Sequence, residues 1–156
     1  VFLPSKPGTV GLPVLGCEVR VVHDQDEPLP SGERGEIVIR GHNVMKGYFN
    51  RPADTAEALR GGWFHTGDIG VIDADGFVSI VDRKKDMVLR GGMNVYPREI
   101  EDVLMTHPAV SLAAVIGVPD ERLGEEVKAY VVLKPGATLT PEALVDWSRE
   151  QLAAYK

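Results

Sequence analysis

Cysteine is almost absent from this sequence, with Cys17 the single example among 156 residues. One cysteine excludes an internal disulfide and a multi-cysteine zinc site, so nothing in the chain requires an oxidising compartment. Long hydrophobic runs are absent too, because the most apolar stretch, 109–118, has about half of the ~20 residues that a membrane helix needs. We therefore expect no membrane span, and no signal peptide is visible.

Excess positive charge is also lacking, because 17 lysines and arginines stand against 23 aspartates and glutamates, a formal net charge of -6. Proteins that bind nucleic acid or anionic membranes non-specifically need a surplus of lysine and arginine. The composition argues against a nucleic-acid partner, and a bound anion would have to be held by a local group of residues. The 44% of apolar and 26% of charged residues are typical of a globular chain.

The first half of the chain carries short β-rich runs separated by Gly, Pro and Asp. Asp75-Gly76 between the last two runs predicts a tight hairpin turn. Pro52 can occupy the first position of a short helix, predicted over 52–59. Together these signals predict a small antiparallel sheet or barrel. Its strands are expected at 18–22, 36–40, 69–73 and 77–81.

The second half of the chain alternates helical and strand patterns. A helix is predicted from Pro97 until Pro108 ends it, followed by buried strands at 109–118 and 127–133. Thr140 is a predicted helix cap, and the helical pattern after it continues to the last residue. The expected inner face of that helix carries Leu144, Val145, Ser148 and Leu152. This order predicts an α+β unit with its helices on one side of a small sheet.

A few residues are candidates for binding chemistry, although each also has a plain structural interpretation. Asp68 could accept hydrogen bonds from two adjacent ribose hydroxyls, but aspartate beside glycine commonly just closes a turn. Arg83 offers a fork of donors for phosphate or ribose oxygens, or belongs to a solvated linker. Gly91 and Gly92 would let a slender ligand lie against the main chain, or form a turn. No metal site is predicted, because the four histidines lack metal-ligand spacing.

Four longer motifs occur in a specific order along nearly the whole chain. The motifs are GTVGLPVLGCEVRVV at 8–22, GEIVIRGHNVMKGYFNRPADTAEAL at 35–59, the segment GGWFHTGDIG to IEDVL at 61–104, and GVPDERLGEEVKAYVVL at 117–133. Together they resemble the AMP-forming acyl-CoA synthetases, a superfamily that includes long-chain fatty-acid CoA ligases, firefly luciferase and the adenylation domains of peptide synthetases.

The resemblance implies an enzyme that uses ATP and Mg²⁺ to convert a carboxylic acid, expected to be fatty, into an acyl-adenylate. The acyl group would then pass to CoA with release of AMP. By the same resemblance Asp68 would hold the ribose hydroxyls of ATP and AMP, and Arg83 would contact the nucleotide. Lys85 would be a hinge, and Gly91 and Gly92 would border the pantetheine of CoA.

The resemblance also implies how the chain is divided. Residues 1–84 would form the last, β-rich and barrel-like subdomain of a large N-terminal adenylating domain, and residues 85–156 most of a small α+β lid. The phosphate-binding loop would precede Val1 and the catalytic lysine would follow Lys156. We therefore expect no catalytic residue within the chain, and expect the fragment alone to be inactive in a cytoplasmic enzyme.

Other interpretations stay open at this point. The acceptor could be a carrier protein, as for peptide-synthetase adenylation domains, although RGGMNVYPREIE at 90–101 is more similar to the CoA ligases. A luciferase-like monooxygenase is a further member of the superfamily. A non-catalytic interaction module would leave Asp68 and Arg83 as plain surface residues. Peripheral contact with a membrane is compatible with all of these.

Overall fold

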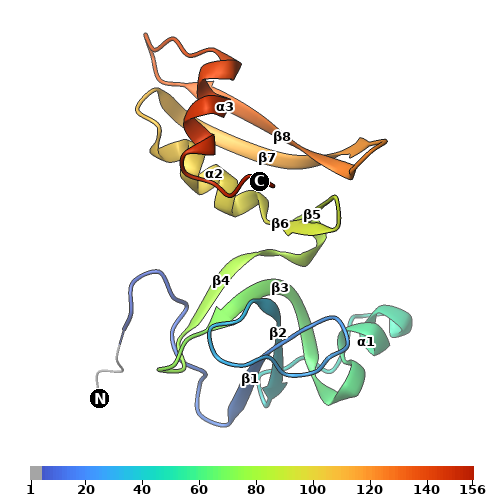
Figure 1. Cartoon of the computed structure of the whole chain (residues 1–156). Helices are drawn as coiled ribbons and strands as arrows, with labels where there is room; N and C mark the ends of the chain where they lie inside the picture. The colour runs from blue at the N-terminus through green and yellow to red at the C-terminus, as the bar shows by residue number, and fades with distance from the viewer. Residues whose placement is uncertain (1–4) are drawn as a thin grey trace. The chain divides into compact units, whose positions relative to one another are not determined.

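The computed structural model describes residues 5–156, in two compact units (Figure 1). The first unit ends at Lys84, and the second comprises Lys85–Lys156. A short 3₁₀ turn, Lys84–Asp86, contains the point of division. No helix among the described residues is long and apolar enough to cross a membrane.

The first unit is built on a four-stranded antiparallel sheet in which each strand pairs with the next along the chain. Val21, Ile37 and Val78 form its buried core, contributed by three different strands. The two outer strands of this ladder do not pair with each other, so the described sheet is open. The strands are β1 (Cys17–Val22), β2 (Gly35–Gly41), β3 (Phe64–Ile72) and β4 (Val78–Arg83).

Local sequence signals explain the connections of this unit. The predicted hairpin between β3 and β4 is confirmed, because the Oδ1 atom of Asp73 accepts hydrogen bonds from the amides of Asp75 and Phe77. Gly76 completes the turn with φ of 86°, a conformation that glycine adopts without strain. The predicted short helix is α1 (Pro52–Ala58), which begins at its proline.

The second unit is a four-stranded antiparallel sheet with two helices on one face (Figure 1). The strand order is β6-β5-β8-β7. Ile100 and Leu104 of one helix and Leu144 of the other are buried against the sheet, as the predicted α+β arrangement requires. The elements are β5 (Val88–Arg90), β6 (Met93–Val95), α2 (Pro97–Thr106), β7 (Val110–Asp120), β8 (Gly124–Leu133) and α3 (Pro141–Arg149).

Two details of the last helix differ from the sequence prediction. The helix α3 ends at Arg149, whereas the pattern predicted helix to the end of the chain. Leu152 and Tyr155 instead pack on the core from the non-helical segment that follows. Val145 is 47% exposed, because the inner face of α3 runs through Leu144 and the partly buried Trp147.

Candidate functional site

Asp68 and Arg83, predicted separately from different motifs, are directly opposite each other on β3 and β4. The Nε atom of Arg83 lies 2.7 Å from Oδ1 of Asp68. The Asp68 side chain is 20% exposed and that of Arg83 is 59% exposed, so the pair is reachable from solvent. The structure thus brings the two predicted nucleotide-binding residues into one ion pair.

A large irregularity in the sheet presents Asp68 in this position. Between the pairs Glu36–Ile69 and Val38–His65, three residues of β3 lie opposite one residue of β2. Such bulges bend a strand and redirect side chains, and they are common beside active sites. Gly67 in the middle of this segment has φ of 72°, which favours glycine.

Side chains hold this bulge where ladder hydrogen bonds are missing. The hydroxyl of Thr66 donates to the carbonyl of Ile37 at 2.7 Å and accepts from the amide of Asp68 at 3.0 Å. The amide of Gly67 donates to Oε1 of Glu36 at 3.2 Å. The segment that carries Asp68 is therefore fixed by hydrogen bonds on both sides of Gly67.

The Asp68–Arg83 pair retains unused hydrogen-bonding capacity. A carboxylate has two acceptor oxygens and a guanidinium has five N–H donors. Within residues 5–156, only Oδ1 of Asp68 and Nε of Arg83 are engaged with each other. The second carboxylate oxygen can accept from hydroxyl groups, and the terminal guanidinium nitrogens can donate to a hydroxyl or phosphate oxygen. This combination suits a ribose with adjacent hydroxyls.

Lys85 is placed apart from this pair, as the first residue of the second unit and the middle residue of the turn Lys84–Asp86. The turn lies between β4, which carries Arg83, and β5. A residue at a boundary between compact units and outside any strand is well placed to absorb a change in backbone angles.

Gly91 and Gly92 form the two-residue turn of the β5–β6 hairpin, in which Arg90 pairs with Met93. Their φ values of 58° and 81° are those of a type I′ turn and explain why both positions are glycine. A Cβ atom on Gly91 would lie 3.3 Å from the side chain of Leu123, whereas Gly92 has open space around it. The turn prediction is confirmed, and the open side of Gly92 is compatible with close approach of a ligand.

The sequence interpretation missed a buried charged cluster behind this site. Glu36 on β2 is 5% exposed, and its Oε2 atom lies 3.1 Å from Nζ of Lys84. Burial alone would raise the pKa of Glu36, but the hydrogen bond and positive charge of Lys84, with the hydrogen bond from the Gly67 amide, bring it below its ordinary value. No local sequence signal predicted this contact, because Glu36 and Lys84 are far apart in sequence.

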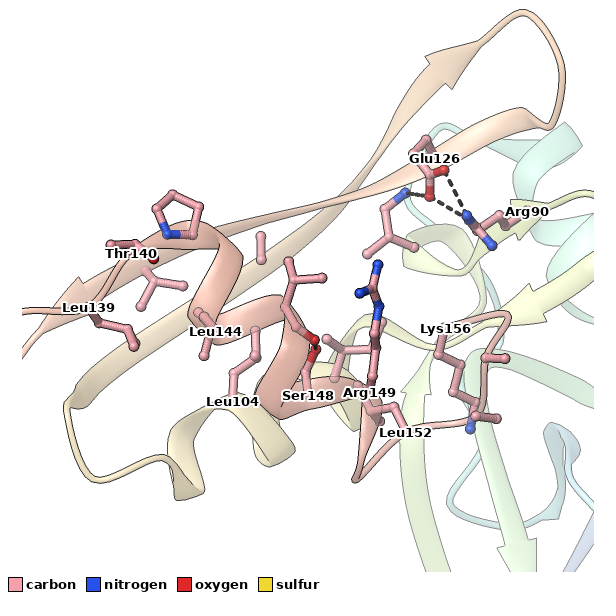
Figure 2. Close-up of a pocket in the computed structure, with 18 of the residues that line it drawn as sticks. Arg90, Leu104, Glu126, Leu139, Thr140, Leu144, Ser148, Arg149, Leu152 and Lys156 are labelled. Carbon is pink, nitrogen blue, oxygen red and sulfur yellow. Dashed lines mark hydrogen bonds and ion pairs between the residues drawn. The ribbon is translucent and has the colours of Figure 1, made fainter.

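The second unit contains a mostly apolar hollow of about 810 Å³ between α3 and β8 (Figure 2). Figure 2 shows Leu144 and Leu152 along the hollow, with Arg90 and Glu126 at one end. Each cation that lines it is paired with a carboxylate. The pairs are Arg90–Glu126, Arg149–Asp146 and Lys156–Glu99.

No group of three or more His, Cys, Asp or Glu side chains among residues 5–156 could hold a metal ion. Such a group would be needed for a site made of protein side chains alone, whereas Mg²⁺ that is bound with a nucleotide usually takes phosphate oxygens and only one or two protein carboxylates.

The Arg90–Glu126 pair leads to a prediction about acid stability. The hydrogen bond from Arg90 lowers the pKa of Glu126 in the folded chain, so the pair stabilises the fold above the unfolded pKa of about 4.3 and is lost as the pH falls through the folded value. We expect the melting temperature of Glu126→Gln to be lower than that of the wild type at pH 7. The difference should shrink between roughly pH 5 and pH 3.

Thermal melts from pH 7 to pH 3 test this expectation. Glu121→Gln is the matched control, since Glu121 is an exposed glutamate in the turn between β7 and β8. The control should follow the wild-type curve. A constant difference between wild type and Glu126→Gln over the whole range would show that the ionised pair does not contribute.

Comparison with known protein families gives two matches within the chain. Residues 3–49 match the family model of AMP-binding enzymes, and residues 99–156 match that of the AMP-binding enzyme C-terminal domain. The first match lies in the first unit and the second match in the second unit.

Curated relatives align over nearly the whole chain. It is 50% identical over 152 residues to a feruloyl-CoA synthase of an Amycolatopsis species, covering 97% of this chain and 31% of the relative. It is 52% identical over 149 residues to a long-chain-fatty-acid–CoA ligase of Escherichia coli, covering 96% of this chain and 26% of the relative. The chain thus spans less than a third of the length of these relatives.

Solved structures show the same arrangement of elements. ATP-bound MatB from Rhodopseudomonas palustris has a TM-score of 0.91 and 43% identity, with 96% of this chain and 30% of that chain covered. The o-succinylbenzoate CoA synthetase of Bacillus subtilis, solved with its acyl-adenylate intermediate, has a TM-score of 0.86 and 40% identity, with 96% and 30% covered. Both alignments extend across residues of the two units.

Proposed function

This chain belongs to the AMP-binding enzymes, and from that premise we propose that it is the C-terminal part of an AMP-forming carboxylic acid–CoA ligase. The observation that carries the proposal is the Asp68–Arg83 pair, accessible and with hydrogen-bonding groups left over, on a bulge fixed by side chains. Relatives with 50% and 52% identity are named as CoA ligases or synthases, which supports the same reaction class.

The proposed reaction has two steps. A carboxylate oxygen of the acid attacks the α-phosphorus of ATP and pyrophosphate leaves, giving an acyl-adenylate. The thiol of CoA then loses its proton, and the sulfur attacks the acyl carbon. The bond to the adenylate oxygen breaks, so that AMP leaves with one oxygen from the acid. Mg²⁺ would neutralise phosphate charge when bound with ATP.

Within this reaction the described residues hold the nucleotide rather than react with it. Asp68 accepts hydrogen bonds from the ribose hydroxyls in both steps, because ATP, acyl-adenylate and AMP share that ribose. Arg83 keeps Asp68 oriented and donates its remaining N–H groups to the nucleotide. We assign no catalytic residue to residues 5–156, which is why the 156-residue chain alone should form neither acyl-adenylate nor acyl-CoA.

We propose that residues 1–84 belong to the adenylating domain and residues 85–156 to a lid that turns at Lys85 between the steps. Gly91 and Gly92 are proposed to border the pantetheine of CoA, which the open space beside Gly92 supports. We also propose a cytoplasmic location, consistent with a single cysteine and no need for a disulfide.

The identity of the acid is a finer proposal. A fatty acid is our first choice, supported by the 52% identity to a long-chain-fatty-acid–CoA ligase. The relatives named for feruloyl-CoA and 2-succinylbenzoate, with 50% and 48% identity, make aromatic acids the alternative.

The test uses the complete polypeptide with ATP, Mg²⁺, CoA and a panel of fatty and aromatic acids. We expect acyl-CoA and AMP in equal amounts for one class of acid, measured by mass spectrometry. A loaded carrier protein in place of CoA tests the other acceptor. Absence of AMP with every acid and both acceptors would contradict the proposed reaction. Formation of acyl-CoA by the 156-residue chain alone would contradict the expectation that this chain carries no catalytic residue.

A further inference from the structure

Glu36 is the only charged or polar residue that is buried among residues 5–156, with 5% of its surface exposed. Removing a carboxylate from water is costly unless other groups pair with it and donate hydrogen bonds. The groups that bind the Glu36 carboxylate therefore indicate its role. None of the roles proposed above uses Glu36.

The two carboxylate oxygens of Glu36 are bound to residues that directly adjoin the two members of the nucleotide pair. Oε1 accepts from the amide of Gly67, the residue immediately before Asp68, at 3.2 Å. Oε2 lies 3.1 Å from Nζ of Lys84, the residue immediately after Arg83. One buried carboxylate thus fixes the neighbours of both members of the pair.

Other charged groups face the same carboxylate. The Nη2 atom of Arg60 lies 3.6 Å from Oε2. The Nδ1 atom of His65 lies 3.4 Å from the same oxygen but makes no hydrogen bond. Lys84 is also 3.0 Å from Asp24, an exposed carboxylate. The cluster therefore holds Glu36 ionised, and Lys84 is held between one buried and one exposed carboxylate.

The Glu36 contacts contribute more to the position of residues 66–68 than side-chain contacts do in a regular strand. Residues 66–68 have no ladder partner on β2, so the amide of Gly67 depends on the Glu36 side chain for its hydrogen bond. On the other side, Lys84 is the last residue of the first unit, directly before the proposed hinge. If Lys84 is fixed, rotation of the backbone must begin after it.

We propose that Glu36 is a positioning residue for nucleotide binding, which holds the Asp68–Arg83 pair in register from the neighbouring strand and fixes the residue before the hinge. It acts through Gly67 and Lys84 and does not touch the nucleotide. This inference rests on the proposed nucleotide role of Asp68 and Arg83.

The test compares AMP binding by calorimetry for the complete polypeptide and its variants. Glu36→Met has a similar length and removes both contacts, and we expect AMP affinity to fall about tenfold. Glu36→Gln keeps an acceptor for the Gly67 amide and should recover part of the loss. Glu33→Gln is the control, an exposed glutamate just before β2, and should bind AMP as the wild type does.

A double-mutant cycle separates positioning from general destabilisation. In an Asp68→Ala background, Glu36→Met should cause a clearly smaller loss of AMP affinity than in the wild type, because the part of its effect that passes through Asp68 is already gone. Residues that act independently would give additive losses. Additive losses, or an unchanged affinity for Glu36→Met in the wild-type background, would overturn the inference.

Hydrogen exchange provides a readout that does not depend on nucleotide binding. We expect the amides of Gly67 and Asp68 to exchange at least about tenfold faster in Glu36→Met, with the core amides of β2 unchanged. If Glu36→Met does not fold, Lys84→Met removes only the second contact and should still weaken AMP binding. Unchanged exchange at both amides would overturn the inference.

The same experiments distinguish this inference from the proposed function. If the wild type does not bind AMP and Asp68→Ala changes nothing, the proposed function fails. Hydrogen exchange of the Gly67 amide in Glu36→Met then still tests whether Glu36 holds this segment. If Asp68→Ala weakens AMP binding but Glu36→Met and Lys84→Met do not, only the positioning role fails.

Discussion

Replacing Asp68 by alanine in the complete polypeptide should weaken the binding of both ATP and AMP about 100-fold, or about 2.7 kcal/mol. The substitution removes a charged acceptor that we propose to receive two ribose hydroxyls. Both steps of the reaction should suffer, because the same ribose is present throughout. Titration calorimetry with AMP and the KM for ATP in the adenylation step measure the effect.

The fold should tolerate this substitution. Arg83 is 59% exposed, so water can solvate it once its partner is gone, and the stability should change by less than about 1 kcal/mol. Asp75→Ala is the matched control, an exposed aspartate in the turn at the opposite end of the same hairpin. An ATP dependence that is the same for Asp68→Ala and wild type would contradict the ribose role.

Replacing Lys85 by proline should slow thioester formation about 100-fold while adenylation changes no more than about threefold. Proline fixes φ near -65°, which removes the backbone freedom that a hinge requires. The two steps are measured separately, by exchange of pyrophosphate into ATP and by acyl transfer from preformed acyl-adenylate to CoA.

Two controls keep this result interpretable. Lys85→Ala removes the side chain but leaves the backbone free, so both steps should continue. Proline also restricts the residue before it, and that residue is Lys84, which is bound to Glu36. Lys84→Met therefore reports the loss of that contact without a proline. Equal losses in both steps for Lys85→Pro would place the hinge elsewhere.

The sequence predicted the fold best where a local signal carries its own geometry. Asp75-Gly76 predicted the β3–β4 hairpin, and Thr140 was a correct cap, since its hydroxyl accepts from the amide of Ala143 at 3.2 Å. Pro97 marked the start of α2. In each case the atoms that define the structure are within four residues of one another, so a short pattern contains the information.

The sequence did not predict the features that depend on contacts between residues far apart in the chain or on very short strands. The strands β5 and β6 have three residues each, too few for alternation to be recognised, although Gly91-Gly92 between them is itself a turn signal. Glu36 would ordinarily be expected at the surface, and the lysine that stabilises it is 48 residues away. Asp68 and Arg83 were chosen by resemblance, but their pairing required knowledge of the register of β3 and β4.

The most direct test of the central claim follows oxygen atoms through the reaction. The acid is supplied with both carboxylate oxygens labelled with ¹⁸O, and the complete polypeptide converts it with ATP, Mg²⁺ and CoA. If an acyl-adenylate forms, AMP leaves with one oxygen of the acid, so mass spectrometry should find one ¹⁸O in each AMP. Unlabelled AMP, or ADP with the label in inorganic phosphate, would contradict the account.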